Sequence, residues 1–87
     1  MATVTLPLML KDVTGGARRT QVSGSTLAEI LGALDRIFPG IQQRIQRDGK
    51  ILPYVILTID GAVAAQGLSS PVGPQSEVSI LPSMGGG

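Results

Sequence analysis

Residues 54–61 read Tyr-Val-Ile-Leu-Thr-Ile-Asp-Gly. Aliphatic and β-branched side chains fill this run, which is typical of a strand, and both of its faces are largely apolar. The pair Asp60-Gly61 is a strong signal for a tight hairpin turn. We therefore expect a strand over residues 54–60, followed by an antiparallel partner over residues 62–64.

After this hairpin the chain passes through a loop and enters a last strand. Residues 66–75 are rich in Gly, Ser and Pro, as loops are. Glu77 to Leu81 then alternate, with Val78 and Ile80 on the core side, and Pro82 ends the ladder because it has no N–H. Residues 83–87 read Ser-Met-Gly-Gly-Gly, and we expect them to form a flexible tail outside a domain of residues 1–82.

Before residue 54 the sequence predicts a hairpin and then a helix. Residues 3–10 carry apolar side chains at alternate positions, which predicts a strand with one buried face: Val4, Leu6, Leu8 and Leu10. Residues 12–16 have the composition of a turn, and residues 17–22 suit a returning strand.

Thr26 with Glu29 three residues later matches a capping box at the start of a helix. The apolar residues that follow have helical spacing: Leu27, Ile30, Leu31, Leu34 and Ile37. The helix should end at Phe38-Pro39-Gly40 because proline lacks a helical donor. We expect a short helical turn over residues 41–47, with Asp48-Gly49-Lys50 as the next break.

These elements predict an α+β domain, in which one main helix packs across one face of a mixed sheet of four to five strands. In such an arrangement the first and last strands lie centrally and run parallel. The C-terminal tail would then project beyond the end of a well-anchored strand.

Composition excludes several classes of function. The 87 residues have a net charge of +1, which is too little to hold a nucleic acid through its phosphates. Without Cys or His the chain lacks thiolate chemistry and the usual zinc ligands, so we predict neither a metal site nor a catalytic nucleophile with its base. The N-terminus has no export signal, and no segment is long and apolar enough to span a membrane. We expect a cytoplasmic protein without a membrane partner.

Several short motifs in this order resemble the ThiS/MoaD family of sulfur carriers, closest to the branch that serves cysteine biosynthesis and other thiocarboxylate pathways. They are Thr14-Gly15-Gly16, Ser25-Thr26-Leu27, Phe38-Pro39-Gly40-Ile41, and Val78 to Pro82 running into Gly85-Gly86-Gly87. The resemblance implies a ubiquitin-like β-grasp fold. It also implies a C-terminal glycine that an E1-like enzyme adenylates with ATP and that becomes a thiocarboxylate, the sulfur donor for a biosynthetic enzyme. The carrier itself would catalyse nothing and hold no cofactor.

The expected reactive site is therefore the glycine terminus. The family commonly ends at Gly-Gly, whereas this chain has a third glycine, so Gly87 is either the reactive terminus or a residue that a tail-processing metalloprotease removes to expose Gly86. Glycines suit a tail that threads into a partner's nucleotide site because they lack a Cβ.

Ordering such a tail costs free energy, so a second docking surface is required. The sheet face opposite the helix should present an unusually apolar surface for this purpose. The residues expected to bind the partner, including the lead-in to the tail, are Met9, Tyr54, Ile56, Thr58, Leu81, Pro82 and Met84.

Two alternatives stay open beside the sulfur carrier. A ubiquitin-like modifier would use the same activated terminus to form an isopeptide bond with a lysine. A plain β-grasp interaction domain would have an inert tail. The arginines at positions 18, 19, 36, 44 and 47 are scattered along the chain, and we interpret them as solvated side chains that at most steer an encounter.

Overall fold

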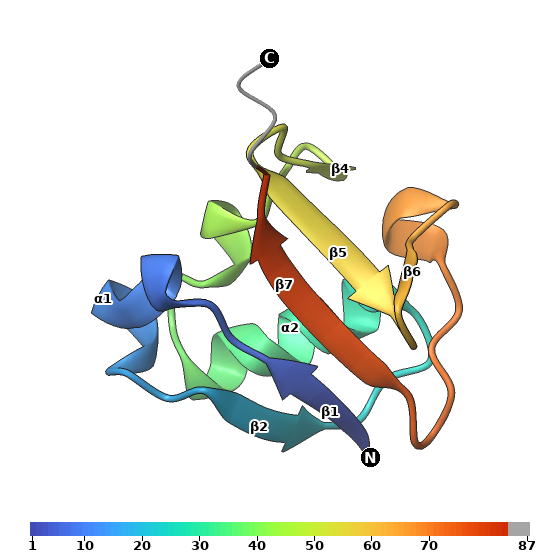
Figure 1. Ribbon diagram of the computed structural model, residues 1–87, viewed down its shortest axis with the longest axis horizontal. Coiled ribbons are helices and arrows are strands. Elements are labelled where there is room, and N and C mark those ends of the chain that lie inside the picture. Colours follow the sequence, from blue (N-terminus) through green and yellow to red (C-terminus); the bar gives the residue numbers. More distant parts are fainter. Residues whose placement is uncertain (84–87) are drawn as a thin grey trace.

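A mixed five-stranded sheet with helix α2 across one face forms the fold in the computed structural model, which describes residues 1–83 (Figure 1). In the sheet order β2-β1-β7-β5-β6, the strands are Arg19–Val22, Ala2–Thr5, Glu77–Pro82, Val55–Ile59 and Ala62–Val63. The predicted α+β architecture is confirmed.

Helix α2 spans Leu27–Ile37, and the other elements are short. They are a 3-10 turn at Leu8–Leu10, helix α1 at Lys11–Thr14, a 3-10 turn at Gln42–Arg44, the hairpin strands β3 (Gln46–Arg47) and β4 (Lys50–Ile51), and a 3-10 turn at Gly67–Ser69. No helix within residues 1–83 has the length and apolar character needed to cross a membrane.

The first and last strands lie side by side inside the sheet and run parallel, as expected. Val4 of β1 is the partner of Val78 in β7. On its other side β7 runs antiparallel to β5, where Ile80 opposes Leu57. β7 therefore has a partner on each edge over its first residues, and β5 continues to pair with it as far as Pro82, where the strand ends.

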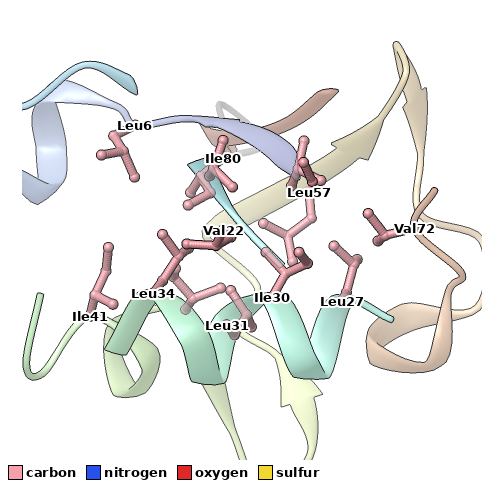
Figure 2. Packing of buried hydrophobic residues seen from close by; sticks show 14 of the residues in the cluster. Leu6, Val22, Leu27, Ile30, Leu31, Leu34, Ile41, Leu57, Val72 and Ile80 are labelled. Carbon is pink, nitrogen blue, oxygen red and sulfur yellow. The ribbon is translucent and has the colours of Figure 1, made fainter. Parts of the chain in front are cut away.

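An aliphatic core fills the space between α2 and the sheet (Figure 2). The apolar stripe predicted for the helix is confirmed, because Leu27, Ile30, Leu31 and Leu34 are fully buried. They face Leu57 and Ile80 of the sheet, as Figure 2 shows. Phe38, just after the helix, packs partly buried against the same cluster.

The first strand is shorter than the sequence predicted. β1 ends at Thr5, and Pro7, which cannot donate to a ladder, leads into the 3-10 turn and then α1. Leu6 and Leu10 are buried, whereas Leu8 is 64% exposed. The predicted strand over residues 3–10 is therefore wrong beyond Thr5. Leucines at every second position also fit a helical turn, in which positions four apart share a face.

The stretch after α2 contains a hairpin that the sequence analysis did not predict. The expected helical turn over residues 41–47 is confined to Gln42–Arg44, and β3 pairs with β4 immediately afterwards. Asp48 and Gly49 join these strands with φ angles of 53° and 77°, both positive as a type I′ turn requires. Asp48-Gly49 is thus a true hairpin signal, but its flanking strands are too short to show alternation.

Thr26 is the N-cap of α2. In a capping box the Glu29 side chain would accept a bond from the N–H of Thr26, but here it accepts from Ser25, the residue before the N-cap. Thr26 Oγ1 accepts a hydrogen bond from Glu29 N–H at 3.3 Å. Glu29 Oε1 accepts bonds from the Ser25 N–H at 2.8 Å and from the Ser25 hydroxyl at 3.0 Å. These bonds favour the ionised carboxylate, so they lower the pKa of Glu29 below its ordinary value of 4.5.

Glu29→Gln should make the protein less sensitive to acid. The pKa of Glu29 is lower in the folded chain than in the unfolded one, so its carboxylate stabilises the fold above the unfolded pKa, and this contribution is lost as pH falls through the folded pKa. Melting temperatures measured from about pH 6 to about pH 3 should fall more steeply for the wild type than for the variant. Asp12, whose pKa is lowered by its bond to Arg44, titrates in both proteins and serves as the common background. Parallel curves would contradict the expectation.

The Asp60-Gly61 pair forms the expected turn and also holds the start of β7. Its φ angles are 52° and 87°. The Asp60 carboxylate accepts a bond from Glu77 N–H at 2.9 Å and another from the Ser76 hydroxyl at 3.0 Å. Asp60 N–H donates in turn to the Glu77 carbonyl at 2.7 Å. One turn residue therefore ties β5 to β7 at the start of β7, the end of this strand pair opposite Pro82.

Asp60→Gly should destabilise the fold by about 1 to 2 kcal/mol, because glycine keeps the positive φ but leaves Glu77 N–H and the Ser76 hydroxyl without their acceptor. Asp60→Asn is the matched control, since asparagine tolerates the same φ and retains an acceptor oxygen for Glu77 N–H. Urea unfolding at neutral pH should separate the two variants. Equal losses of stability would mean that the turn conformation, and not the side-chain bonds, carries the effect.

Candidate functional site

Strand β7 leads to the end of the described chain, and it pairs with β1 over Glu77–Ser79 on one side and with β5 on the other. Its core-facing residues Val78 and Ile80 are buried. Strand β5 pairs with β7 along the whole stretch from Val78 to Pro82. Beyond the strand, Ser83 N–H donates to the Tyr54 carbonyl at 2.9 Å. The chain is therefore held in place as far as Ser83, the last residue that the structure describes.

Apolar side chains gather around the point where the chain leaves β7. Ile56 and Leu81 are direct cross-strand partners on the sheet face turned away from α2, and Leu81 is 40% exposed. Tyr54, 53% exposed, lies just before β5 and receives the bond from Ser83. Pro82 is exposed at the end of β7. We call Tyr54, Ile56, Leu81 and Pro82 the exit patch.

Thr58 and Met9 were also predicted for the partner surface, and both lie outside the exit patch. Thr58 shares the face of Ile56 but lies two cross-strand pairs further from the exit. Met9 is not part of the sheet, because it lies in the 3-10 turn after β1 and packs partly buried against the core. Its predicted place on the outer sheet face is wrong, since the first strand ends before it. Met84 of the predicted partner surface lies outside the described part of the chain, as does the predicted reactive terminus, Gly85-Gly86-Gly87.

Val63 belongs to the same sheet face and was missing from the sequence prediction. It is 68% exposed and pairs with Thr58. The two-residue turn at Asp60-Gly61 sets this register, because Ile59 must then oppose Ala62 and Thr58 must oppose Val63. The turn signal alone was enough to place Val63 beside Thr58.

Among residues 1–83, neither the exit patch nor the groove beside the start of α2 has a catalytic arrangement. The four residues of the exit patch carry no charge. A groove of about 750 Å³ lies between the start of α2, β4 and the 3-10 turn at Gly67–Ser69, and Lys50 is the only charged residue among the nine that line it. Neither place brings a nucleophile next to a base. The exit patch is suited to binding a partner.

This arrangement is that of a ubiquitin-like β-grasp protein, in which the C-terminus follows a central strand that runs parallel to the first. Here the strand leads within a few residues to a sequence of three glycines. The chain belongs to the ThiS family, whose family model matches residues 4–87. The resemblance drawn from the sequence motifs is thereby confirmed. With this family comes the function of a sulfur carrier, a protein that serves as a substrate and carrier instead of a catalyst.

Individual relatives agree with this assignment. The chain is 29% identical over 90 residues to the sulfur carrier protein CysO of Mycobacterium tuberculosis, covering 98% of this chain and 97% of the relative. It is also similar to CysO in the crystal structure of the BexX/CysO complex of Amycolatopsis orientalis, with a TM-score of 0.92, 26% identity and full coverage of both chains. SAMP1 of Haloferax volcanii has a TM-score of 0.74 and 27% identity, with 99% of this chain and 98% of that chain covered.

Proposed function

We propose that the C-terminal glycine carboxylate of this chain is adenylated by an E1-like enzyme and then converted to a thiocarboxylate that donates sulfur to a biosynthetic enzyme. One observation carries the proposal: the sequence reaches the three glycines two residues after β7, a strand that pairs with β1 over Glu77–Ser79 and with β5 over Val78–Pro82, and an exposed apolar patch lies at its exit. The chain would hold no cofactor, and the partner enzyme would consume ATP.

In the proposed reaction this chain supplies only its terminal carboxylate, and the activating enzyme supplies the rest of the reaction site. A carboxylate oxygen attacks the α-phosphate of ATP, pyrophosphate leaves, and an acyl adenylate forms. A sulfur nucleophile at the oxidation level of sulfide then attacks the acyl carbon and AMP leaves, so that one sulfur has replaced one carboxylate oxygen. Adenylation makes AMP a good leaving group, which a free carboxylate does not have.

The exit patch is the proposed docking surface for the activating enzyme. Ordering the glycines inside a nucleotide site costs roughly 1 to 2 kcal/mol per residue, and contacts on the folded domain must offset that cost. Leu81 and Tyr54 offer exposed apolar surface within a few residues of the tail, so a partner that covers them also receives the terminus.

A relative supports the idea that such carriers form stable complexes, since CysO of Amycolatopsis orientalis was crystallised with BexX. By analogy we propose two classes of partner for this chain, the E1-like adenylating enzyme and the sulfur-accepting enzyme. A metalloprotease that removes Gly87 is a third, because the chain ends in three glycines and not two.

The intact mass of the protein tests this function. After incubation with ATP, a sulfide source and the activating enzyme, the mass should rise by the difference between one sulfur and one oxygen. Parallel reactions with the full chain and with a chain that ends at Gly86 identify the reactive terminus. If neither chain gains mass while the enzyme activates a known carrier in the same mixture, the proposal fails.

A second candidate is a protein modifier, which the likeness to SAMP1 favours, because the Haloferax volcanii relative is named small archaeal modifier protein 1. Both functions share adenylation and differ in the product. A modifier would produce a ladder of heavier conjugates in cell extract, whereas a carrier would remain a free protein bearing one sulfur. Immunoblots of an extract with an internally tagged chain would separate them.

A further inference from the structure

Strand β2 is the outer strand of the sheet on the side opposite β6 (Figure 1). Within residues 1–83 its pairing partner is β1, from Arg19 to Val22. An edge strand presents unpaired backbone groups to which another extended chain can add. Neither the fold nor the proposed function assigns a role to this edge.

The register decides which backbone groups of β2 are open. Leu6 N–H donates to the Arg18 carbonyl at 2.8 Å, so Arg18 belongs to the hydrogen-bonded pairs of the β1–β2 ladder. Antiparallel ladders alternate, and the N–H and C=O of Arg19 and Gln21 must therefore point away from β1. No bond joins these groups to any other element within residues 1–83. The open edge thus offers two donors and two acceptors at the spacing of a β-ladder.

Two arginines lie on opposite faces of this edge. The side chain of Arg19 is exposed on the outer sheet face, as is that of Gln21, whereas Arg18 alternates to the face that α2 covers. Neither guanidinium has an ion-pair partner within residues 1–83, where the recorded ion pair joins Arg44 to Asp12 at 2.6 Å. No acidic residue occurs from Val13 to Ala28. The edge is therefore locally positive in a nearly neutral protein.

The nearest carboxylate on the outer face by strand register does not neutralise this charge. Glu77 of β7 aligns with Thr3, and Thr3 aligns with Gln21, so Glu77 lies two strands away from β2. Strands are spaced about 4.8 Å apart, which puts Glu77 roughly 10 Å from the edge. A carboxylate of an incoming chain would be much closer to Arg18 and Arg19.

The charge decides between possible occupants of the edge. Arginines on an edge strand commonly block pairing between two copies, because like charges then meet. The same charges attract an extended segment that carries carboxylates on either of its faces. We propose that the β2 edge binds an extended acidic peptide segment of a partner protein, which adds to the sheet as a further strand beside β2.

This site is independent of the proposed activation chemistry. Strand β5, which carries Ile56 of the exit patch, is separated from β2 by β1 and β7. An acidic strand at β2 would therefore leave the exit patch free. Binding at the edge also needs no activated terminus, so it can be measured on the protein alone.

A capped seven-residue peptide that alternates glutamate with valine is the probe. Titrated into ¹⁵N-labelled protein, it should shift the amide signals of Arg19 and Gln21 most and slow their hydrogen exchange, because their N–H groups gain acceptors. The same peptide with glutamine in place of glutamate should bind at least about threefold more weakly. Raising the salt to about 0.5 M should weaken binding of the acidic peptide.

Two variants of the protein test the two parts of the argument. Arg18→Gln combined with Arg19→Gln should weaken the acidic peptide about three- to tenfold, whereas Arg36→Gln, which removes a charge from α2, should leave binding unchanged. Gln21→Pro removes an outward N–H without touching the bonds to β1, and it should abolish the slowed exchange. If Gln21→Pro does not fold, the native protein can be tested with a peptide that is N-methylated at alternate amides. Such a peptide lacks the N–H groups that would pair with β2.

Three outcomes would overturn the proposal. Equal affinity for the acidic and the neutral peptide would remove the charge argument. Undiminished binding of the N-methylated peptide would show ionic attraction without strand addition. Concentration-dependent dimerisation in sedimentation, abolished by Gln21→Pro, would make a second copy of this chain the occupant of the edge.

Discussion

Removing Gly86 and Gly87 should abolish the gain of sulfur when the protein is incubated with ATP, sulfide and its activating enzyme. The shortened chain ends two residues earlier, which withdraws the carboxylate by about 7 Å. The domain cannot compensate, because β5 pairs with β7 through Pro82 and Ser83 N–H is bonded to the Tyr54 carbonyl. A reacting group misplaced by only about 1 Å can lose a hundredfold in rate, so we expect product below detection.

The fold should not change in this truncated protein, because the last strand ends at Pro82. Its melting temperature and far-UV spectrum should match those of the full chain, and it should still compete with the full chain for the activating enzyme through the exit patch. A truncated chain that gains sulfur at the normal rate would show that the glycine terminus is not the reactive group.

The two strands that carry the exit patch could be predicted from sequence, and their pairing could not. The runs at residues 54–60 and 77–81 have strong β patterns, and the structure has β5 and β7 there. That Ile56 opposes Leu81 depends on a pairing between segments 25 residues apart, with a loop and a hairpin between them. No local turn sets this register, so the sequence alone could name both residues without placing them together.

Short sequence patterns predicted the strand pairing correctly where a tight turn fixed the register. They were misleading where spacing alone had to distinguish a strand from a helical turn. Asp60-Gly61 implied the partner of Thr58, and the structure has Val63 there. The leucines between residues 4 and 10 fitted a strand and a helical turn equally well in their spacing. In the structure the strand ends before Pro7 and a 3-10 turn follows. Met9 therefore lies in this turn, partly buried against the core, and not on the outer sheet face as predicted.

Ile56→Asp should reduce the activation of this carrier by at least about thirtyfold while leaving it folded. Ile56 is half-buried opposite Leu81 and is not one of the buried core residues, so the variant does not place a charge in the core. A charge placed in the centre of an apolar interface commonly costs 2 kcal/mol or more of binding, and about 1.4 kcal/mol corresponds to a factor of ten. The loss should appear mainly in the KM for the carrier, because the terminus and its chemistry are unchanged.

Val63→Asp is the matched control, since Val63 lies on the same sheet face but on β6, at the far side of Thr58 from the exit. If the partner covers the exit patch, Val63→Asp should change the KM by less than about threefold, and Leu81→Asp should reproduce the effect of Ile56→Asp. The double variant should be no worse than either single one, because Ile56 and Leu81 are in direct contact across the strands and act as one contact. Equal losses for Ile56→Asp and Val63→Asp would place the docking surface over the whole outer face. Loss of the folded far-UV spectrum in Ile56→Asp would make Ile56 a core residue, and the exit patch would then consist of Tyr54, Leu81 and Pro82.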